Sequence, residues 1–227
     1  MIKKVIVAGS EGLIGHSVST FLTEAGLEVI KCDILLGHDL NNENFVKNFF
    51  KTNKADALIN LFALNDHIDT KSNSTSLFDV SLNSFEAYLR CNLVSLFSVC
   101  REYARNNDEG SIVNFSSTYG VVSPQPDLYE KNNPKDIGYV VSKAGVPQLT
   151  RYLAVHLAPK IRVNCVIPGG VERDHTDNFK NKYGKKTPIG RMMNVKELNG
   201  IVKYLISDEA SYTTASTICI DGGWTAW

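Results

Sequence analysis

The sequence predicts an α/β fold, a doubly wound parallel sheet of six to seven strands with helices on both faces. Short runs of apolar, largely β-branched residues alternate along the chain with segments of helical periodicity. Several of these runs are apolar at consecutive positions, which is typical of strands buried on both faces of a parallel sheet. A glycine-rich turn separates the first apolar run from the first helical segment, as in folds of this class that bind nucleotides.

The bulk composition limits the kinds of partner. The 227 residues include 24 Lys and Arg and 24 Asp and Glu, for a formal net charge of +0. Without a basic run, this balance argues against nucleic acid and anionic membranes as partners, and no apolar run is long enough to span a bilayer. No Gly/Ser-rich or Pro-rich linker divides the chain, so we expect residues 1–227 to form a single domain. The five cysteines are scattered in apolar segments, and we interpret them as reduced core residues of a cytoplasmic protein.

The first strand is expected at residues 4–8 and the first helix at residues 13–25. Between them, Gly9, Gly12 and Gly15 form a G-x-x-G-x-x-G pattern. Glycines allow the backbone to turn tightly and to approach a pyrophosphate, whose charge then lies at the N-terminus of the helix. The turn therefore predicts a dinucleotide site.

The second strand is expected at residues 28–31, followed by Cys32 and Asp33. A carboxylate at this place can accept hydrogen bonds from both adenosine ribose hydroxyls and repels a 2′-phosphate, which favours NAD over NADP. Glu11, in the glycine turn, adds to that repulsion. An ordinary strand-end acid remains the alternative interpretation of Asp33. The chain from Asp33 to the next strand-like end at residues 38–40 is too short for a full crossover helix.

The central part of the chain contains a long, largely apolar helix. A helix at residues 42–51, a buried strand at 55–62 and a polar loop at 65–76 lead to it. The long helix is expected at residues 84–105, with apolar residues on more than one face and Asn92 among them. A buried asparagine must be hydrogen-bonded, either to a neighbour or to a water at a site, and the sequence leaves both open.

A strand at residues 111–117 ends in Ser116 and Ser117. Ligands bind at the carboxyl ends of strands in open α/β sheets, so we expect both hydroxyls to face the glycine turn. Asp136 is expected to cap the next helix. Pro147 lies inside that helix and lacks the N–H that would bond the carbonyl four residues earlier, so we expect a bend there.

The same helix carries Tyr139 and Lys143. Residues four apart lie one turn apart on the same helix face, so the phenol and the ammonium can converge on one cleft. A neighbouring ammonium favours the phenolate, and we expect Lys143 to lower the pKa of Tyr139 so that it exchanges a proton near neutral pH. Tyr-x-x-x-Lys is a weak pattern alone, because a solvated helix face would give the same spacing.

The last third of the chain supplies two strands, at residues 162–167 and 217–221, and a helix at 195–206. The charged segment 172–186 is expected to be irregular and to form a flap over the site. Acids clustered in a polar loop are usually solvated, so we expect no metal site here. The residues considered as ligands were Glu172, Asp174, His175 and Asp177.

In their order along the chain, these motifs resemble the short-chain dehydrogenase/reductase family over nearly the whole sequence. The resemblance implies a Rossmann-type sheet. Any one motif could arise by accident, but the order makes accident improbable. The matching motifs are the glycine turn, Asp33, Asn92, Ser117, Tyr139 with Lys143, Arg162-Val163-Asn164, Pro168-Gly169, Thr187-Pro188-Ile189-Gly190-Arg191 and Asp221-Gly222-Gly223-Trp224.

The resemblance also implies roles for individual residues. Tyr139 would exchange the proton, Ser117 would bind the substrate oxygen and Lys143 would hold the nicotinamide ribose. Asn92 would position a proton-relay water. The expected cofactor is NAD, with NADP less favoured. The residues that the resemblance assigns to cofactor binding are Gly9, Gly12, Leu13, Ile14, Gly15, Asp33, Asp39, Leu40, Leu61, Phe62, Ala63, Tyr139, Lys143, Pro168, Gly169 and Val171.

Four departures from the family pattern are visible. Gly12 lies one place earlier than in the main branch of the family. Asn60-Leu61-Phe62-Ala63 replaces Asn-Asn-Ala-Gly, which removes the polar contact of the second asparagine. The chain after Asp33 is shortened, which weakens the assignment of Asp39 and Leu40. The segment between Ser117 and Tyr139 is longer than usual.

The expected activity is hydride transfer between NAD(H) and a secondary alcohol or ketone. Amides, hydroxyls and charges between Ser117 and Tyr139, and after Gly170, predict a polar, hydroxylated small-molecule substrate resembling a sugar. Two alternatives are an NAD-binding sensor or scaffold without turnover and a sugar epimerase or dehydratase. The glycine spacing favours an epimerase or dehydratase, and the short chain argues against it.

The helices at 84–105 and 139–158 carry apolar or small residues beyond one face. The family pairs these helices between subunits, so we expect a homodimer or homotetramer.

Overall fold

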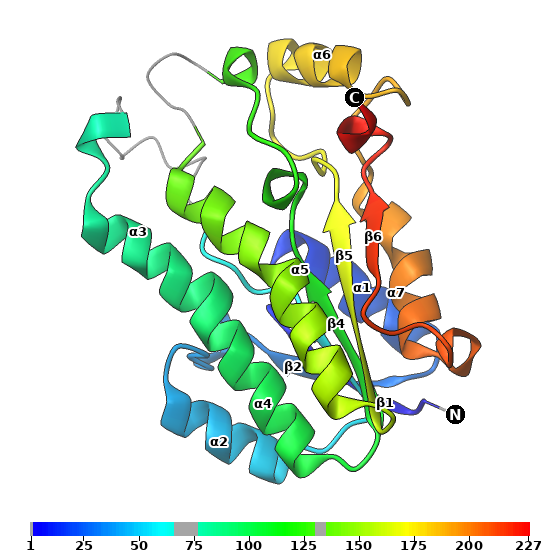
Figure 1. Ribbon diagram of the computed structural model, residues 1–227. Helices are drawn as coiled ribbons and strands as arrows, with labels where there is room; N and C mark the ends of the chain where they lie inside the picture. The colour runs from blue at the N-terminus through cyan, green and yellow to red at the C-terminus, as the bar shows by residue number, and fades with distance from the viewer. Residues whose placement is uncertain (1, 66–76, 130–134) are drawn as a thin grey trace.

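The computed structural model describes residues 2–65, 77–129 and 135–227. All but the first residue of the loop expected at 65–76 lie outside this part of the chain. Six parallel strands form one sheet in the order β2-β1-β3-β4-β5-β6 (Figure 1). The strands are β1 (Lys4–Ala8), β2 (Glu28–Cys32), β3 (Ala57–Asn60), β4 (Gly110–Phe115), β5 (Ile161–Pro168) and β6 (Thr217–Ile220). The doubly wound parallel sheet predicted from the sequence is thus confirmed, with the lower of the two strand numbers.

The order of the strands places a crevice at the carboxyl ends of β1 and β3. The chain runs outward from β1 to β2 and then returns to the other side of β1 with β3. Helices after β1 and β3 consequently leave in opposite directions, and ligands of open α/β sheets bind where this reversal occurs. The glycine turn directly follows β1, so the fold puts it at the crevice.

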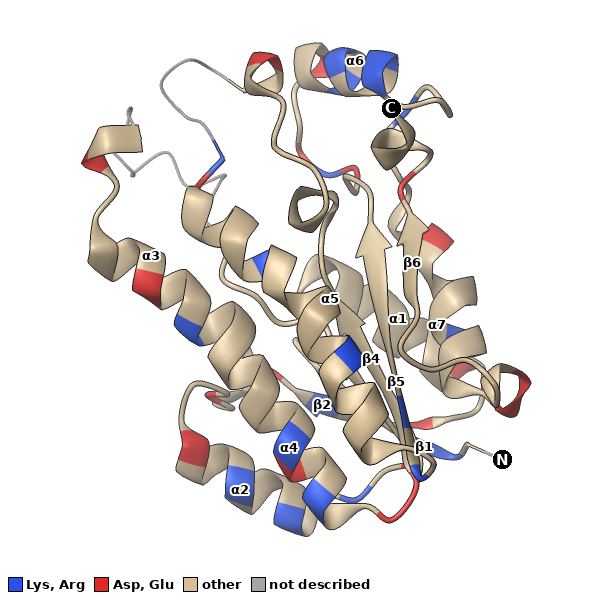
Figure 2. Ribbon diagram, viewed as in Figure 1, with Lys and Arg blue, Asp and Glu red and all other residues tan. Residues whose placement is uncertain are grey.

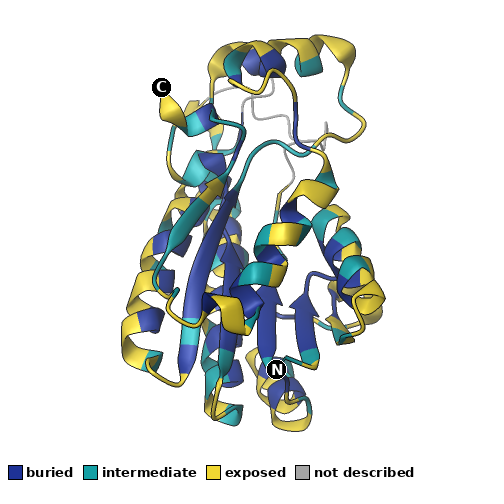
Figure 3. Cartoon of the chain, turned by 90° about the vertical axis from the view of Figure 1, so that its right-hand side faces the viewer, coloured by how far each residue is buried: buried dark blue, intermediate teal, exposed yellow. Residues whose placement is uncertain are grey.

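Helices cover both faces of the sheet. Side chains of β1 alternate between two cores, with Ile6 in one and Val5 and Val7 in the other. The first core packs against α2 (Glu43–Thr52), α4 (Leu96–Asn106) and α5 (Ile137–Leu157); the second packs against α1 (Leu13–Glu24) and α7 (Asn199–Ile206). Figure 3 shows buried strands between helices that expose their outer sides.

The long helix expected at residues 84–105 contains a π segment. The helix α3 (Leu82–Leu89) leads into π-helical turns over Arg90–Ser95 and then into α4. Asn92 lies in the π segment and is buried. π-helical turns are rare and often occur at functional sites, and apolar periodicity alone does not reveal them.

Two expectations about the later helices have different outcomes. Asp136 caps α5, since its carboxylate accepts a hydrogen bond from the Gly138 N–H at 2.6 Å, and the expected cap is confirmed. The segment 172–186 is not irregular throughout: α6 (Asp177–Lys186) is a helix, with the Thr176 hydroxyl accepting from the Phe179 N–H. That expectation was wrong because α6 has few apolar positions, so apolar periodicity does not reveal it. Its lysines are visible in Figure 2.

Among the described residues, no helix has the length and apolar character needed to cross a bilayer. All five cysteines are unpaired. Cys32, Cys100 and Cys165 are buried, as expected, but Cys219 is exposed on β6 at the edge of the sheet. Its interpretation as a core residue was wrong because an edge strand presents one side to solvent.

Candidate active site

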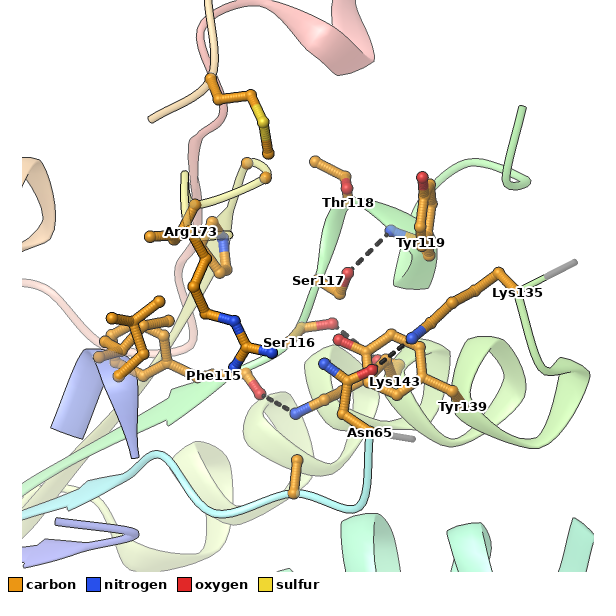
Figure 4. A pocket seen from close by; sticks show the side chains of 18 of the residues that line it. Asn65, Phe115, Ser116, Ser117, Thr118, Tyr119, Lys135, Tyr139, Lys143 and Arg173 are labelled. Carbon is orange, nitrogen blue, oxygen red and sulfur yellow. Dashed lines mark hydrogen bonds between the residues drawn. The ribbon is translucent and has the colours of Figure 1, made fainter. Parts of the chain in front are cut away.

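A pocket of about 380 Å³ lies at the carboxyl ends of β1, β3, β4 and β5. Its floor is formed by the glycine turn and the segment after β3, and its walls by the segments after β4 and β5 together with α5 and α6. This is the place that the strand order assigns to a ligand. Figure 4 shows the part of the pocket around α5.

The structure brings Ser117, Tyr139 and Lys143 together at this pocket. All three line it, and each is at most 9% exposed. Tyr139 and Lys143 lie on the same face of α5, as their spacing predicts, and Ser117 follows β4 opposite them (Figure 4). The Lys143 ammonium donates a hydrogen bond to the Phe115 carbonyl at 2.9 Å. A hydroxyl, a phenol and an ammonium therefore face one buried space.

The pKa values of this group differ from the sequence-based expectation. Burial raises the pKa of Tyr139, and its hydrogen bond with Ser117 offsets only part of that rise. Lys143 does not lower it, because its ammonium is engaged by Phe115 and lies 6.0 Å from the centre of the Tyr139 ring. Burial also lowers the pKa of Lys143 to about 8. The expected lowering of the Tyr139 pKa by Lys143 was therefore wrong, because desolvation outweighs the more distant charge.

Ser116 and Pro147 explain how α5 is held against β4. Pro147 has no N–H to donate to the Lys143 carbonyl four residues earlier, which leaves that carbonyl without its helical partner. The Ser116 hydroxyl donates to it instead at 2.7 Å. Gly120 makes the approach possible, since a Cβ there would lie 2.5 Å from the Ser116 Oγ. The proline thus creates an anchoring point next to Lys143.

The glycine turn fits a dinucleotide pyrophosphate. Gly9 has a φ of +85° and packs against the Phe62 backbone, and a Cβ on Gly15 would lie 1.9 Å from the Gly9 carbonyl oxygen. Both glycines are thus required by packing. Gly12 is different: it borders the pocket, and a Cβ there would meet only the Gly9 carbonyl, at 3.5 Å. As the N-cap of α1 it has no side chain to cover the first-turn N–H groups, which suits an anion.

Asp33 follows β2 as expected, but it does not line this pocket. Its carboxylate is 7% exposed and accepts hydrogen bonds from the backbone N–H groups of Glu11 and Leu35 at 3.0 and 2.9 Å. Asp33 therefore ties the glycine turn to the end of β2, which gives the strand-end interpretation a concrete structural role. The Glu11 carboxylate pairs with Lys31 at 3.2 Å, and this hydrogen-bonded lysine lowers the pKa of Glu11.

Five other predicted residues also lie outside the pocket lining. Gly9 packs against the Phe62 backbone, Leu40 is buried in the core and the Phe62 side chain packs against that core. Asp39 is exposed and accepts a hydrogen bond from the Asn41 N–H.

Asn92, the last of these, bonds the Leu64 N–H and carbonyl and the Ser142 hydroxyl. Its side chain thus satisfies neighbours, the first of the two possibilities left open. Those bonds hold the segment after β3 against α5. The remaining predicted residues all line the pocket: Gly12, Leu13, Ile14, Gly15, Leu61, Ala63, Ser117, Tyr139, Lys143, Pro168, Gly169 and Val171.

Sequence reasoning missed a ring of aromatic and cationic side chains around the same space. Tyr119 and Tyr129 line the pocket, and their hydroxyls are hydrogen-bonded at 2.6 Å. Tyr119 lies two residues after Ser117, a position that could have drawn attention to it. Lys135 is four residues before Tyr139, as Lys143 is four after, but it precedes the helix, so periodicity did not identify it. Arg173 also faces the pocket (Figure 4).

Within the described ranges, no three His, Cys, Asp or Glu side chains are grouped so that they could hold a metal ion. Two of the residues considered as ligands, Glu172 and His175, have other contacts. Glu172 pairs with Lys180 at 2.8 Å, and the His175 ring stacks on Phe179 with 4.8 Å between ring centres. Burial lowers the pKa of His175.

Comparisons with known proteins agree with the fold. A family model described as enoyl-(acyl carrier protein) reductase matches residues 4–225. A 3-oxoacyl-(acyl-carrier-protein) reductase FabG from Chlamydia pneumoniae is 30% identical over 220 residues, which cover 93% of this chain and 82% of the relative.

Solved structures give the same result. A short chain dehydrogenase from Leptospira borgpetersenii with bound NAD⁺ is 29% identical and has a TM-score of 0.86, covering 99% of this chain and 93% of that chain. A gluconate 5-dehydrogenase from Burkholderia cenocepacia, in complex with NADP and tartrate, has a TM-score of 0.84 at 21% identity, with 99% of this chain and 96% of that chain covered. At 21% identity, the likeness to the gluconate 5-dehydrogenase concerns the fold alone.

Proposed function

The chain belongs to the short-chain dehydrogenase/reductase family of oxidoreductases, and on this premise we propose that it transfers a hydride between NAD(H) and a secondary alcohol or ketone. The convergence of Ser117, Tyr139 and Lys143 on one pocket carries the proposal. The N-terminus of α1 borders the same pocket at Gly12, and no side chain caps its first N–H groups. A proton-exchanging group and a place for a pyrophosphate thus share one space.

The residues divide into those that hold the dinucleotide and those that act on the substrate. The first turn of α1 would hold the pyrophosphate, Asp33 the adenosine ribose and Lys143 the nicotinamide ribose. When bound, the nicotinamide supplies or accepts the hydride. Ser117 and Tyr139 both present hydroxyls that can bond the reacting oxygen. Because burial raises the pKa of Tyr139, the phenol keeps its proton at neutral pH and can donate it to a developing oxyanion.

The pocket lining supports a polar, hydroxylated substrate resembling a sugar. Four residues that carry hydroxyls line it from the segment after β4, namely Ser117, Thr118, Tyr119 and Tyr129. Aromatic faces accompany them, since Tyr129 and Phe179 are in contact with 6.1 Å between ring centres. Hydroxyl groups recognise the edges of a sugar, and aromatic faces suit its C–H surface.

A second candidate substrate is a 3-oxoacyl thioester, because the FabG relative has that activity in its name and matches nearly the whole chain. Steady-state rates of NADH oxidation by the purified protein should separate the two candidates. We expect turnover with ketoses or keto-sugar derivatives and little with 3-oxoacyl thioesters. Turnover of the thioesters alone would replace the sugar-like assignment, and binding of NADH without turnover of any carbonyl would favour a sensor or scaffold. An epimerase or dehydratase would interconvert sugars without net consumption of nucleotide.

We also propose that NAD is preferred over NADP. Asp33 brings a buried carboxylate to the end of β2, where a 2′-phosphate would be repelled. Calorimetric titration should show NADH binding at least about tenfold more tightly than NADPH, a free-energy difference of about 1.4 kcal/mol. Asp33→Asn should reduce the ratio of the NADH affinity to the NADPH affinity. Tighter binding of NADPH by the unchanged protein would contradict the preference.

A further inference from the structure

Lys135 places a second ammonium beside Tyr139. Its Nζ lies 3.9 Å from the centre of the Tyr139 ring, much nearer than the Nζ of Lys143 at 6.0 Å. Lys135 is 9% exposed and lines the pocket. Figure 4 shows it reaching Tyr139 from a different side than Lys143 does. The phenol therefore lies between two cations that come from different directions.

The position of Lys135 is determined by its neighbours. It precedes Asp136, the cap of α5, and its ammonium donates to the Asn65 side-chain oxygen after β3. Lys143 instead donates to the carbonyl of Phe115, the last residue of β4. Since Lys143 is assigned to the nicotinamide ribose, Lys135 is the lysine that borders the space for the substrate. An ammonium carries three N–H donors and a positive charge, both of which suit a carboxylate.

The described part of the pocket lining carries charge of one sign. Lys135, Lys143 and Arg173 belong to it, and no Asp or Glu among the described residues does. The formal net charge of the whole chain is +0, so the described lining is more positive than the chain as a whole. Positive charges along a cleft shielded from water attract anions more strongly than they do on an open surface. The N-terminus of α1 is assigned to the dinucleotide phosphates. Lys135 places positive charge beside Tyr139, where the substrate would bind.

We propose that Lys135 selects a substrate with a carboxylate close to the reacting carbon, that is, an oxo acid and the corresponding hydroxy acid. This inference rests on the proposed function, because Ser117 and Tyr139 must hold the reacting oxygen. The ammonium lies over the ring whose hydroxyl exchanges the proton, so it reaches substituents near that oxygen and not the far end of a long acyl chain. The carboxylate stays ionised throughout, since the hydride and the proton add to the neighbouring carbonyl.

The test compares oxo acids with their neutral amides. Suitable probes are acetoacetate and acetoacetamide, pyruvate and pyruvamide, and a ketogluconate and its amide. Calorimetry measures their binding to the complex of the protein with NADH, and steady-state kinetics give kcat and KM. We expect at least one acid to bind roughly tenfold or more tightly than its amide, as one charge-assisted hydrogen bond provides. Added salt should weaken the binding of the acid and leave the binding of the amide unchanged.

Variants assign the effect to Lys135. Lys135→Gln should remove the advantage of the acid over the amide, whereas Lys135→Arg should retain most of that advantage. Lys51→Gln, on the exposed side of α2 and away from the pocket, is the matched control. Melting temperature and NADH affinity confirm that each variant is folded.

Three results would overturn the inference. The unchanged protein could bind acids and amides equally or bind no acid. Lys135→Gln could leave the preference for the acid intact. It could also impair acid and amide equally with a shifted pH profile, which would make Lys135 a positioning residue for Tyr139. Failure of the proposed function is distinguishable, because NADH would then bind while no carbonyl compound, charged or neutral, was reduced.

Discussion

At the scale of single residues, burial has more effect on the site than the Tyr-x-x-x-Lys spacing suggests. Spacing correctly predicts that Tyr139 and Lys143 share a face of α5, because helical geometry is local. It does not predict that Tyr139 is only 8% exposed, nor that a carbonyl of β4 engages the lysine. Those features depend on strands far away in the chain. The resulting phenol retains its proton at neutral pH, which suits a proton donor to a reduced carbonyl.

The lowered pKa of Lys143, about 8, predicts pH-dependent binding of the dinucleotide. Below pH 8 the side chain is an ammonium, which attracts the phosphates and donates to the ribose. As the pH rises through about 8, the free protein loses this charge, so the dissociation constant for NADH should increase. Tyr139 keeps its proton over the same range because its pKa is raised.

Fluorescence titration of NADH on both sides of pH 8 measures this effect. Lys143→Arg should flatten the curve, because a guanidinium stays charged. A dissociation constant that does not change across pH 8 in the unchanged protein would contradict the prediction.

At the scale of elements, the positions of strands and of most helices could be predicted because apolar periodicity reports burial directly. The π segment at Arg90–Ser95 could not, since this helix is apolar on more than one face and a local change of helical period does not stand out in its sequence. The helix α6 was missed because distant segments hold it. Its Tyr183 stacks on Trp224, and its Lys182 donates to the Asp127 carbonyl. Such contacts join segments distant in sequence, and one-dimensional patterns do not show them.

The anchoring of α5 by Ser116 gives a test at this scale. Ser116→Ala should leave the Lys143 carbonyl buried without a partner and lower the free energy of unfolding by about 1–3 kcal/mol. Combining it with Pro147→Ala restores a backbone N–H four residues after Lys143, so the double variant should recover part of that loss.

Chemical denaturation of the two single variants and the double variant provides the double-mutant cycle. Pro147→Ala alone is the control for the effect of the proline on α5. Strict additivity of the two changes would show that Ser116 does not substitute for the missing helical bond.

At the scale of the whole molecule, both helices expected to form subunit contacts carry exposed apolar side chains. Val94 and Phe97 on the π segment and α4, and Val141, Tyr152 and Val155 on α5, are exposed. Contact between two copies would remove this surface from water. We therefore maintain the proposal of a homodimer or homotetramer, built from chains in which residues 1–227 form one domain.

Light scattering should give a mass at least twice that of one chain. Phe97→Glu combined with Val155→Glu should shift the protein to monomers, because it introduces charge into the apolar contact. Tyr212→Glu is a suitable control, since Tyr212 is also exposed but lies outside these helices. A mass of one chain at all concentrations would contradict the proposal.

The central claim is that the Tyr139 phenol exchanges a proton with a substrate beside a dinucleotide held by the glycine turn. Its most direct test measures kcat and NADH affinity for Tyr139→Phe and for Tyr119→Phe, which removes another phenol hydroxyl from the same pocket. We predict that Tyr139→Phe lowers kcat by roughly 10²- to 10⁴-fold with NADH affinity unchanged, while Tyr119→Phe keeps most of the activity. Full activity of Tyr139→Phe, with NADH bound as tightly as before, would contradict the account.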